Sequence, residues 1–347
     1  MNIFIDPAYK AYYQDELFNA QNRILNRDDT LSPFIRMRKS LEERNVTVKT
    51  ADYLINNSDD SIRGDYYSFG VLDNFEALFK RKNIKLKSFI VLEPPVVSPE
   101  LYSILPRLTK KFESVYLHNT IGDGYSLKGV ETSKLKKLYW PQPYNNVIES
   151  YWSRLERKRR IVVINGNHKP KSYTEELYSN RIEVISQLKN LNFVDLYGRH
   201  WEKWWSRSSM WLPYWKNRKA LMSVYKGSCT SKLDVLSQYD FCLCFENMYM
   251  NSYITEKIFD CFYAGTVPIY MGAKNIDELI TPAAFIDFKK FSNIKELTNY
   301  LACITPQELH DFRMAAYYFI QSDEGMKYYD SVRNIIDPLS VQEVALC

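Results

Sequence analysis

Two short apolar runs, 241–245 (FCLCF) and 267–271 (VPIYM), lie on either side of a helix-like segment, 255–264. In that segment Ile258 and Phe262 recur at helical spacing and form one apolar face. Two neighbouring strands joined by a helical crossover run parallel. A strand that is apolar throughout is typical of a parallel sheet covered on both faces. The segment therefore predicts an α/β fold.

The same alternation of strands and helices occurs in both halves of the chain. The expected strands are 2–5, 46–50, 88–92 and 114–117 in the first half and 160–164, 193–197, 241–245 and 267–271 in the second. The expected helices are 32–45, 76–82 and 99–111, and then 173–190, 231–238 and 255–264. Between the halves, 139–144 (YWPQPY) carries two prolines and suits a linker.

This organisation predicts two Rossmann-like domains, because a chain of 347 residues is long for one. We expect an N-terminal domain at 1–150, a C-terminal domain at 151–325, and a tail at 326–347 that packs back on the N-terminal domain. Two such domains facing across a cleft would hold ligands at the carboxyl ends of their strands.

The composition argues against several classes of protein. No apolar run reaches about 18 residues, and the N-terminus does not resemble a signal peptide. Cys242, Cys244 and Cys261 lie in apolar runs, which suits reduced thiols and a cytoplasmic protein. The net charge of +5 is too small to indicate a nucleic-acid partner. We interpret the basic run 157–160 as a solvated helix end, with a nucleic-acid or membrane contact as the alternative.

Two polar clusters interrupt the apolar sequence between 245 and 267. Glu246 and Asn247 follow an expected strand, at the ligand-binding edge of the sheet. Thr255 can cap the next helix, and Glu256 and Lys257 fall in its first turn. A lysine there opposes the helix dipole, which makes sense if an anion such as a nucleotide diphosphate docks at the helix start. Glu256 could then accept hydrogen bonds from ribose hydroxyls. The alternative is a capping box with a solvated Glu-Lys pair.

Several ordered blocks resemble the α-1,3/4-fucosyltransferases, glycosyltransferase family 10, of the bacterial type. The quoted residues are "FEN", "YITEK" and "AGTVPIYMG" within 245–272, preceded by "SNRIEVISQL" and "VDLYGR" and followed by "FIDFKKFSNIKELTNYL". The resemblance covers roughly 160–301, and the N-terminal half is only weakly similar. It implies a GT-B fold, an N-terminal domain that binds the acceptor, a GDP-fucose donor and inversion at the anomeric carbon.

The resemblance also implies roles for residues of the donor site. Arg181 and Lys257 would contact phosphate, and Glu256 would contact the ribose. Asn247 and Tyr253 would line the donor pocket. Glu246 and Thr255 join the candidate donor-binding residues through their places at the strand end and the helix start. From the sequence alone, Arg181 would be interpreted as a surface residue.

Inverting transfer needs a base that takes the proton of the acceptor hydroxyl. The family places a carboxylate at the end of a strand in the N-terminal domain, and Glu93 in "SFIVLEPPVVSP" is the candidate here. Pro94 stands where the family often has serine. The alternative is a turn glutamate without a chemical role.

The expected reaction needs no metal and no cofactor, because the sequence has no Asp-x-Asp for a divalent ion. We expect fucose transfer to a glycan hydroxyl, through an α-1,3 linkage to a GlcNAc-type sugar of a surface polysaccharide or lipopolysaccharide. The alternatives are a GT-B transferase with another nucleotide sugar and a non-catalytic glycan-binding protein.

Residues 200–219 (HWEKWWSRSSMWLPYWKNRK) are rich in tryptophan and basic residues. This composition is typical of a peripheral membrane contact at the inner face of the membrane. It also suits stacking on an acceptor sugar, or a lid whose tryptophans form a small core. We leave these three interpretations open.

Overall fold

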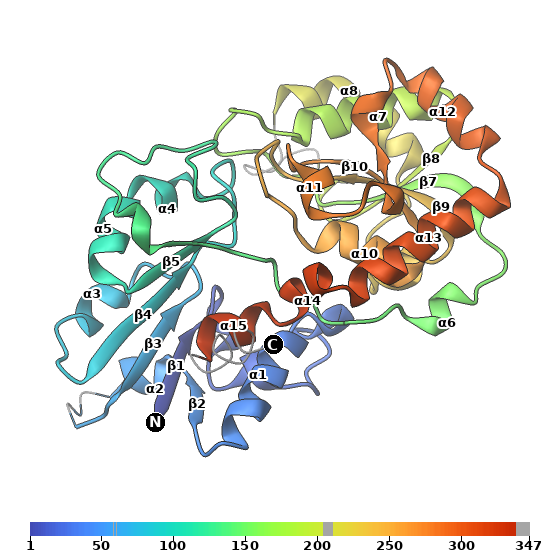
Figure 1. The fold of residues 1–347 in the computed structure, drawn as a ribbon. Helices are drawn as coiled ribbons and strands as arrows, with labels where there is room; N and C mark the ends of the chain where they lie inside the picture. Colours follow the sequence, from blue (N-terminus) through green and yellow to red (C-terminus); the bar gives the residue numbers. More distant parts are fainter. Residues whose placement is uncertain (58, 60, 204–210, 338–347) are drawn as a thin grey trace. The chain divides into compact units, whose positions relative to one another are not determined.

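The computed structural model describes residues 1–57, 59, 61–203 and 211–337. The chain forms two compact units (Figure 1). The N-terminal unit comprises Met1–Pro143 together with Lys327–Cys347, and the C-terminal unit comprises Tyr144–Met326. Each unit is a parallel sheet with helices packed on it.

The N-terminal unit has a six-stranded sheet in the order β2-β1-β3-β4-β5-β6, and all its pairs are parallel. Its strands are β1 (Asn2–Asp6), β2 (Thr47–Thr50), β3 (Gly64–Ser68), β4 (Ile84–Ile90), β5 (Ser114–Leu117) and β6 (Leu135–Lys137). Its helices are α1 (Ser32–Glu42), α2 (Asp52–Ile55), α3 (Phe75–Leu78), α4 (Pro99–Ser103), α5 (Leu105–Lys111) and α15 (Ser331–Ile336). α14 (Asp323–Tyr329) spans the boundary between the units.

The two faces of this sheet carry separate apolar cores. One core joins the sheet to α3, α4 and α5 and includes Phe89 and Phe112, whose ring centroids are 5.4 Å apart. The other joins the sheet to α1 and α15 through residues such as Met37 and Ile336. In Figure 1 these helix groups lie on opposite sides of the sheet. The carboxyl ends of the strands are therefore the edge that remains for a binding site.

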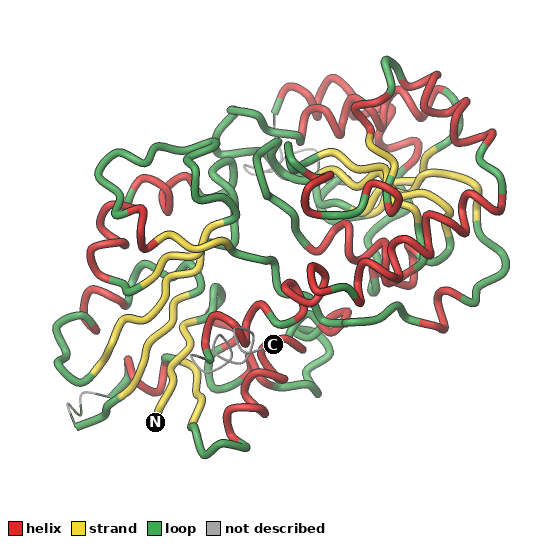
Figure 2. Tube along the Cα trace, viewed as in Figure 1, coloured by secondary structure: helices red, strands yellow, loops and turns green. Residues whose placement is uncertain are grey.

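The C-terminal unit has a five-stranded parallel sheet in the order β11-β10-β9-β7-β8. Its strands are β7 (Lys158–Ile164), β8 (Val194–Tyr197), β9 (Tyr239–Phe245), β10 (Val267–Met271) and β11 (Ile286–Asp287). Its helices are α6 (Glu149–Trp152), α7 (Tyr178–Asn190), α8 (Leu212–Val224), α9 (Lys232–Leu236), α10 (Glu256–Ala264), α11 (Ile276–Leu279), α12 (Ile294–Cys303) and α13 (Pro306–Gln321). Figure 2 shows its strands gathered together with helices around them. Every residue of β9 is buried, as expected for a central strand.

The N-terminal unit differs from the sequence expectation at several elements, with β3, β4 and the segment 99–111 among them. The central strand β3 was not predicted, because its sequence GDYYS lacks a continuous apolar run. The expected strand 88–92 is β4, which begins at Ile84 and ends at Ile90. The expected helix 99–111 is divided at Ile104 into α4 and α5, just before Pro106.

The basic run 157–160 is not a solvated helix end, because Lys158 already begins β7. Its arginines donate hydrogen bonds to backbone carbonyls within the C-terminal unit. Arg157 Nη2 donates to Ala264 (3.1 Å), Arg159 Nη2 to Leu301 (2.9 Å) and Arg160 Nη2 to Val194 (3.1 Å). The run therefore ties β7 to neighbouring elements, and a contact with nucleic acid or a membrane is not needed to explain it.

The unit boundaries follow from local packing. Residues 144–152 belong to the C-terminal unit, where the Ile148 N–H donates to the carbonyl of Tyr263 (3.1 Å). At the other end of the chain, α15 packs on α1, and the Tyr67 hydroxyl donates to the carbonyl of Ile336 (3.1 Å). Arg44 also pairs with Asp337. The chain therefore returns to the N-terminal unit before residue 338.

The tryptophan-rich segment lies partly outside the described residues, since 204–210 are among those not described. Trp201 and Trp211 are 2% and 7% exposed. Trp201 donates from Nε1 to the carbonyl of Asn165 (2.7 Å), and its ring contacts Tyr214. Trp201 and Trp211 favour the core-packing interpretation, whereas Trp215 on α8 is 38% exposed. No helix among the described residues is long and apolar enough to cross a membrane.

Candidate functional site

Polar residues that follow β9 form one hydrogen-bonded group in the C-terminal unit. Glu246 is 0% exposed, and its N–H donates to the carbonyl of Met271 at the end of β10 (2.8 Å). Its carboxylate accepts hydrogen bonds from the N–H of Thr255 (2.8 Å), the hydroxyl of Thr255 (2.8 Å) and Nζ of Lys257 (3.1 Å). A buried carboxylate requires such donors. Glu246 therefore joins the end of β9 to the start of α10.

Thr255 stands at the N-cap position of α10, but its side chain does not cap the helix. The hydroxyl donates to Glu246 and accepts a hydrogen bond from Lys257 Nζ (2.9 Å). The prediction of a side-chain cap was therefore wrong, because the carboxylate and the ammonium group occupy the hydroxyl. The alternative of a solvated Glu-Lys pair is also wrong, since the Lys257 side chain is only 17% exposed.

Glu256 and two lysines form a charged group at the start of α10. Nζ of Lys257 lies 3.8 Å from Glu256 Oε1, and Nζ of Lys232 lies 4.0 Å from the same oxygen. Burial raises the pKa of Glu256, but the ammonium groups of Lys257 and Lys232 outweigh burial and lower the pKa to about 2. Burial lowers the pKa of Lys257, but the carboxylates of Glu246 and Glu256 raise it above its usual value. At neutral pH Glu256 is an ionised acceptor and Lys257 is a cation.

Lys232 is a site candidate that the sequence interpretation missed. It begins α9, and its Nζ donates to Asp260 Oδ2 on α10. With Glu256 and Lys257 it lines a small cavity of about 60 Å³. A lysine in the first turn of a helix opposes the helix dipole. Lys232 opposes a helix dipole in the same way as Lys257, so the signal was present in the sequence.

Arg181 lies in the first turn of α7 and is 3% exposed, so it is not a surface residue. Its Nη2 donates to the carbonyls of Phe245 (2.7 Å) and Glu246 (3.0 Å), and its buried Nε has no partner among the described residues. Burial lowers the pKa of Arg181. In this arrangement Arg181 holds the end of β9. Its contact with phosphate stays a prediction.

Asn247 and Tyr253 lie on the loop between β9 and α10. The carbonyl of Asn247 accepts a hydrogen bond from the N–H of Leu177, next to α7 (3.0 Å). Tyr253 is 0% exposed, and its carbonyl accepts a hydrogen bond from the hydroxyl of Tyr270 (3.3 Å). The structure therefore places both residues beside Glu246 and its partners, with the Tyr253 ring inside the core. Their contacts with a donor stay predictions.

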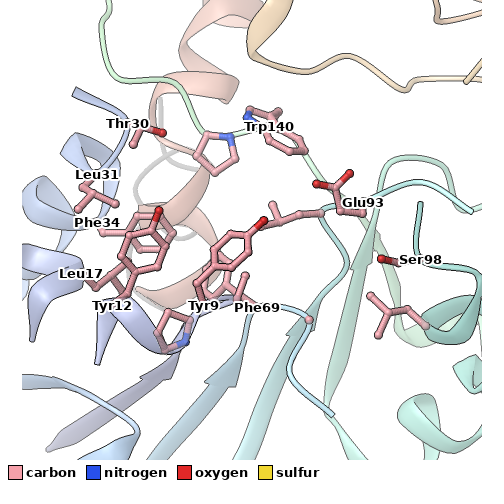
Figure 3. A pocket seen from close by; sticks show the side chains of 16 residues that line it. Tyr9, Tyr12, Leu17, Thr30, Leu31, Phe34, Phe69, Glu93, Ser98 and Trp140 are labelled. Atoms are coloured by element: carbon pink, nitrogen blue, oxygen red, sulfur yellow. The ribbon is translucent and has the colours of Figure 1, made fainter. Parts of the chain in front are cut away.

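Glu93 belongs to the N-terminal unit and follows β4 after two further residues. It lines a cavity of about 370 Å³ together with aromatic residues from four segments of the unit. These aromatic residues are Tyr9, Tyr12, Phe34, Phe69 and Trp140. Figure 3 shows the Glu93 carboxylate and the Trp140 ring at one end of the cavity, with the Tyr9 hydroxyl directed toward that end.

Tyr9 and Trp140 are binding candidates that sequence reasoning did not identify. Tyr9 is 64% exposed, and its partial burial together with the charge of Glu93 raises the pKa of Tyr9. Exposed aromatic faces beside a carboxylate suit a sugar, whose C–H groups stack on rings while its hydroxyls form hydrogen bonds. No sequence signal marked these two residues, because they lie far from Glu93 in the chain.

Among the described residues, no group of three or more His, Cys, Asp or Glu side chains is arranged to hold a metal ion. The positive charges of Lys232 and Lys257 lie at the start of α9 and α10. Lysines at helix N-termini can neutralise a phosphate group directly.

Comparison with known proteins connects this site to a family. Residues 155–320 match the model of "glycosyltransferase family 10 (fucosyltransferase) C-term". A stretch of 71 residues is 39% identical to the α-(1,3)-fucosyltransferase FucT of Helicobacter pylori and covers 20% of this chain. That stretch spans 15% of the length of the curated relative.

The fold is shared with two solved structures of low sequence identity. A crystal structure of an α1,3-fucosyltransferase has a TM-score of 0.51 and 14% identity, with 100% of this chain and 90% of that chain covered. The Anabaena protein HepE in complex with UDP has a TM-score of 0.54 and 13% identity, with 99% and 100% covered. At 14% and 13% identity, these two structures show that the chain shares their fold and nothing more.

Proposed function

Since residues 155–320 belong to glycosyltransferase family 10 and the two parallel α/β units form a GT-B fold, we propose that the protein transfers fucose from GDP-fucose to a hydroxyl of an acceptor glycan. One observation carries this proposal. The segment that matches the family also contains the charged group at the start of α10, with Lys257, Glu256 and Lys232 side by side.

In the proposed reaction the C-terminal unit binds the GDP portion of the donor. Lys257 and the N-terminus of α10 contact the diphosphate, as positive groups at a helix start favour phosphate. Glu246 and Thr255 hold the Lys257 ammonium group in place. Arg181 completes the phosphate contacts that family membership suggests. The bond between the anomeric carbon and the diphosphate oxygen breaks, and its electrons leave with the diphosphate. These positive charges stabilise the departing diphosphate.

Glu256 binds the ribose of the donor in this proposal. Its low pKa keeps it ionised at neutral pH, so both of its oxygens can accept hydrogen bonds from hydroxyl groups. Asn247 and Tyr253 complete the donor pocket from the loop before α10.

Glu93 is the proposed general base. The acceptor hydroxyl oxygen attacks the anomeric carbon from the face opposite the diphosphate, and its proton passes to the Glu93 carboxylate. The new bond forms as the bond to GDP breaks, so the configuration inverts. The aromatic cavity around Glu93 supports this role, because it offers rings for an acceptor sugar next to a carboxylate.

We further propose that the acceptor is a GlcNAc-type sugar of a surface polysaccharide or lipopolysaccharide and that the linkage is α-1,3. We place the reaction in the cytoplasm. The buried, reduced Cys242, Cys244 and Cys261 support this compartment. A peripheral membrane contact through residues 200–219 remains a proposal that rests on their composition.

The test is a panel of GDP-, UDP- and other nucleotide sugars, each incubated with the protein and a mixed set of glycan acceptors. Of all the nucleotide sugars in the panel, we expect only GDP-fucose to give nucleotide release and labelled product. Product with a different nucleotide sugar and none with GDP-fucose would assign another donor. Tight glycan binding without turnover on any donor would make the protein a glycan-binding protein instead.

A further inference from the structure

The N-terminal unit contains a second cavity beside the one that Glu93 lines. Its volume is about 550 Å³. Both cavities are bordered by Pro7, Ala8, Gly70, Ser98 and Leu101, so they are neighbours along the carboxyl edge of the sheet. The second cavity carries the polar residues Lys10, Tyr13, Asp52, Asn56, Asp73, Asn74 and Glu100. None of these residues takes part in the reaction proposed above.

Asp52 has unsatisfied hydrogen-bonding capacity in this cavity. The residue is 8% exposed, and its Oδ2 accepts a hydrogen bond from the N–H of Gln14 (3.1 Å). Its Oδ1 is buried and has no partner among the described residues. A buried acceptor without a partner destabilises the folded state, because it has lost its hydrogen bonds to water. A native protein tolerates such a group where it has a role, and a ligand hydroxyl would satisfy it.

The neighbouring polar side chains are held in fixed positions. Asp6, at the end of β1, is 0% exposed and accepts hydrogen bonds from the hydroxyl of Tyr13 (2.7 Å), the hydroxyl of Tyr66 (2.5 Å) and Nδ2 of Asn74 (2.7 Å). Tyr13 and Asn74 both line the cavity. Because Asp6 orients them, little conformational entropy is lost when they bind a ligand.

The chemistry of the lining favours a neutral ligand with many hydroxyls. Carboxylates at Asp52, Asp73 and Glu100 accept hydrogen bonds, and Lys10 can donate them. Three carboxylates against one lysine disfavour a phosphate or a nucleotide. Leu72 and Leu101 add an apolar surface for the C–H faces of a ring. This mixture is what a sugar residue requires.

From these contacts we infer that the second cavity is a subsite for a further sugar residue of the acceptor, with Asp52 Oδ1 accepting a hydrogen bond from one of its hydroxyls. The inference rests on the proposed function, because it assumes that the first cavity holds the reacting sugar. It makes the preferred substrate an oligosaccharide that occupies both cavities, and it makes Asp52 a residue that selects for chain length.

The experiment compares monosaccharide acceptors with oligosaccharides that contain the same reacting sugar. Wild type is measured beside Asp52→Asn and Asp52→Ala, with Glu43→Gln as a matched control. Glu43 is an exposed carboxylate of the same unit that lines neither cavity. Release of GDP from GDP-fucose without acceptor and the melting temperature report whether the donor site and the fold are intact.

For the oligosaccharide we expect kcat/KM to fall about tenfold or more in Asp52→Ala, through a higher KM, as the loss of a hydrogen bond to a charged group predicts. We expect a smaller fall in Asp52→Asn, since the amide can still bond to a hydroxyl. Neither substitution should change transfer to the monosaccharide or the release of GDP without acceptor.

Three results would overturn the inference, and they can be told apart. If wild type transfers to no acceptor at all, the proposed function fails and the subsite fails with it. If wild type is active but neither Asp52 variant changes the ratio of kcat/KM for oligosaccharides to kcat/KM for monosaccharides, the proposed function stands and the subsite is wrong. A defect confined to acceptors that carry an amino group would assign the cavity to a cation instead of a neutral sugar.

Discussion

Lys257 has two roles that must be separated before its substitution can be interpreted. Its ammonium group is the proposed phosphate contact, and it also neutralises the buried carboxylate of Glu246 at 3.1 Å. Removing Lys257 leaves the buried Glu246 carboxylate without this counterion, and removing Glu246 leaves Lys257 with Glu256 as its counterion at 3.8 Å. A simple alanine variant of Lys257 would therefore lose stability as well as phosphate binding, and it could not report on catalysis alone.

We expect Glu246→Gln to lower the free energy of unfolding by about 3 kcal/mol, because it breaks a buried ion pair and removes the nearer of the two carboxylates that compensate Lys257. The double variant Glu246→Gln with Lys257→Met should recover much of that loss, yet transfer should stay low because the phosphate contact is gone. Urea unfolding and turnover of these two variants and of Lys257→Met alone give the measurement.

Glu156→Gln is the control for this cycle, since Glu156 is an exposed carboxylate of the same unit. It should be neutral in both assays. Near wild-type turnover of the double variant, with normal donor affinity, would show that Lys257 is not part of the diphosphate site.

Glu93 can be tested as the base by Glu93→Gln, which keeps the shape of the side chain but cannot take a proton. We expect normal affinity for GDP-fucose and a rate of transfer lower by about 10²–10⁴. Donor affinity comes from calorimetry and the rate from single-turnover kinetics. Unchanged transfer beside an unchanged Glu43→Gln control would direct attention to another carboxylate of the N-terminal unit.

At the scale of elements, the site depends on how closely the end of β10 approaches the end of β9. A Cβ atom at Gly272 would lie 2.4 Å from Cγ of Glu246 and 2.6 Å from the Tyr270 hydroxyl. Such distances are far below a van der Waals contact, so the absence of a side chain at Gly272 makes room for Glu246. The position of Glu246 in turn fixes Thr255 and Lys257 at the start of α10.

Gly272→Ala should therefore displace Glu246, lower stability by about 1–3 kcal/mol through overpacking, and weaken GDP-fucose binding. Gly227→Ala is the comparison, because its Cβ would meet no atom within 4 Å although its φ of +95° disfavours alanine. Thermal unfolding should detect both variants, but calorimetry should find weaker donor binding only for Gly272→Ala. Equal donor affinity in the two would contradict the role given to Glu246.

The charges at the start of α10 also predict that the free energy of unfolding depends on pH. Because Lys257 and Lys232 outweigh burial and lower the pKa of Glu256 to about 2 from the ordinary 4.5, the ionised carboxylate stabilises the folded state above pH 4.5. That contribution is lost as the pH falls from 4.5 toward 2. Wild type should lose free energy of unfolding more steeply over this range than Glu256→Gln does. Urea unfolding at several pH values measures the difference, and parallel curves would contradict the assignment.

At the scale of the whole molecule, we expect transfer to proceed without a divalent ion. The positive groups proposed to neutralise the leaving diphosphate belong to the chain itself, at Lys257, Arg181 and the N-terminus of α10. Activity should therefore persist in excess chelator. Complete loss on chelation, with recovery on adding manganese, would replace this mechanism with a metal-assisted one.

Much of the fold could be predicted from the sequence where local patterns were strong. The expected strands 114–117 and 267–271 coincide with β5 and β10, and the expected helix 255–264 coincides with α10 to within one residue. These segments are continuous apolar runs or carry a clear helical period, which depends only on neighbours in the chain. β3 was missed because it is stabilised as a strand by its neighbours β1 and β4 and carries little local signal.

The sequence by itself determined the α/β class, the resemblance to a family and the identity of the polar residues between β9 and α10, because these depend on residue type and spacing. Only the tertiary structure decided what those residues contact. In the structure the Thr255 hydroxyl donates a hydrogen bond to Glu246 instead of capping α10. Arg181 is buried against the end of β9, and Lys232 lies next to Glu256. The tertiary structure also gathered Tyr9 and Trp140 around Glu93 and left Asp52 Oδ1 without a partner. Such contacts join residues far apart in the chain, and they form only when the strands are ordered side by side and the helices close over them.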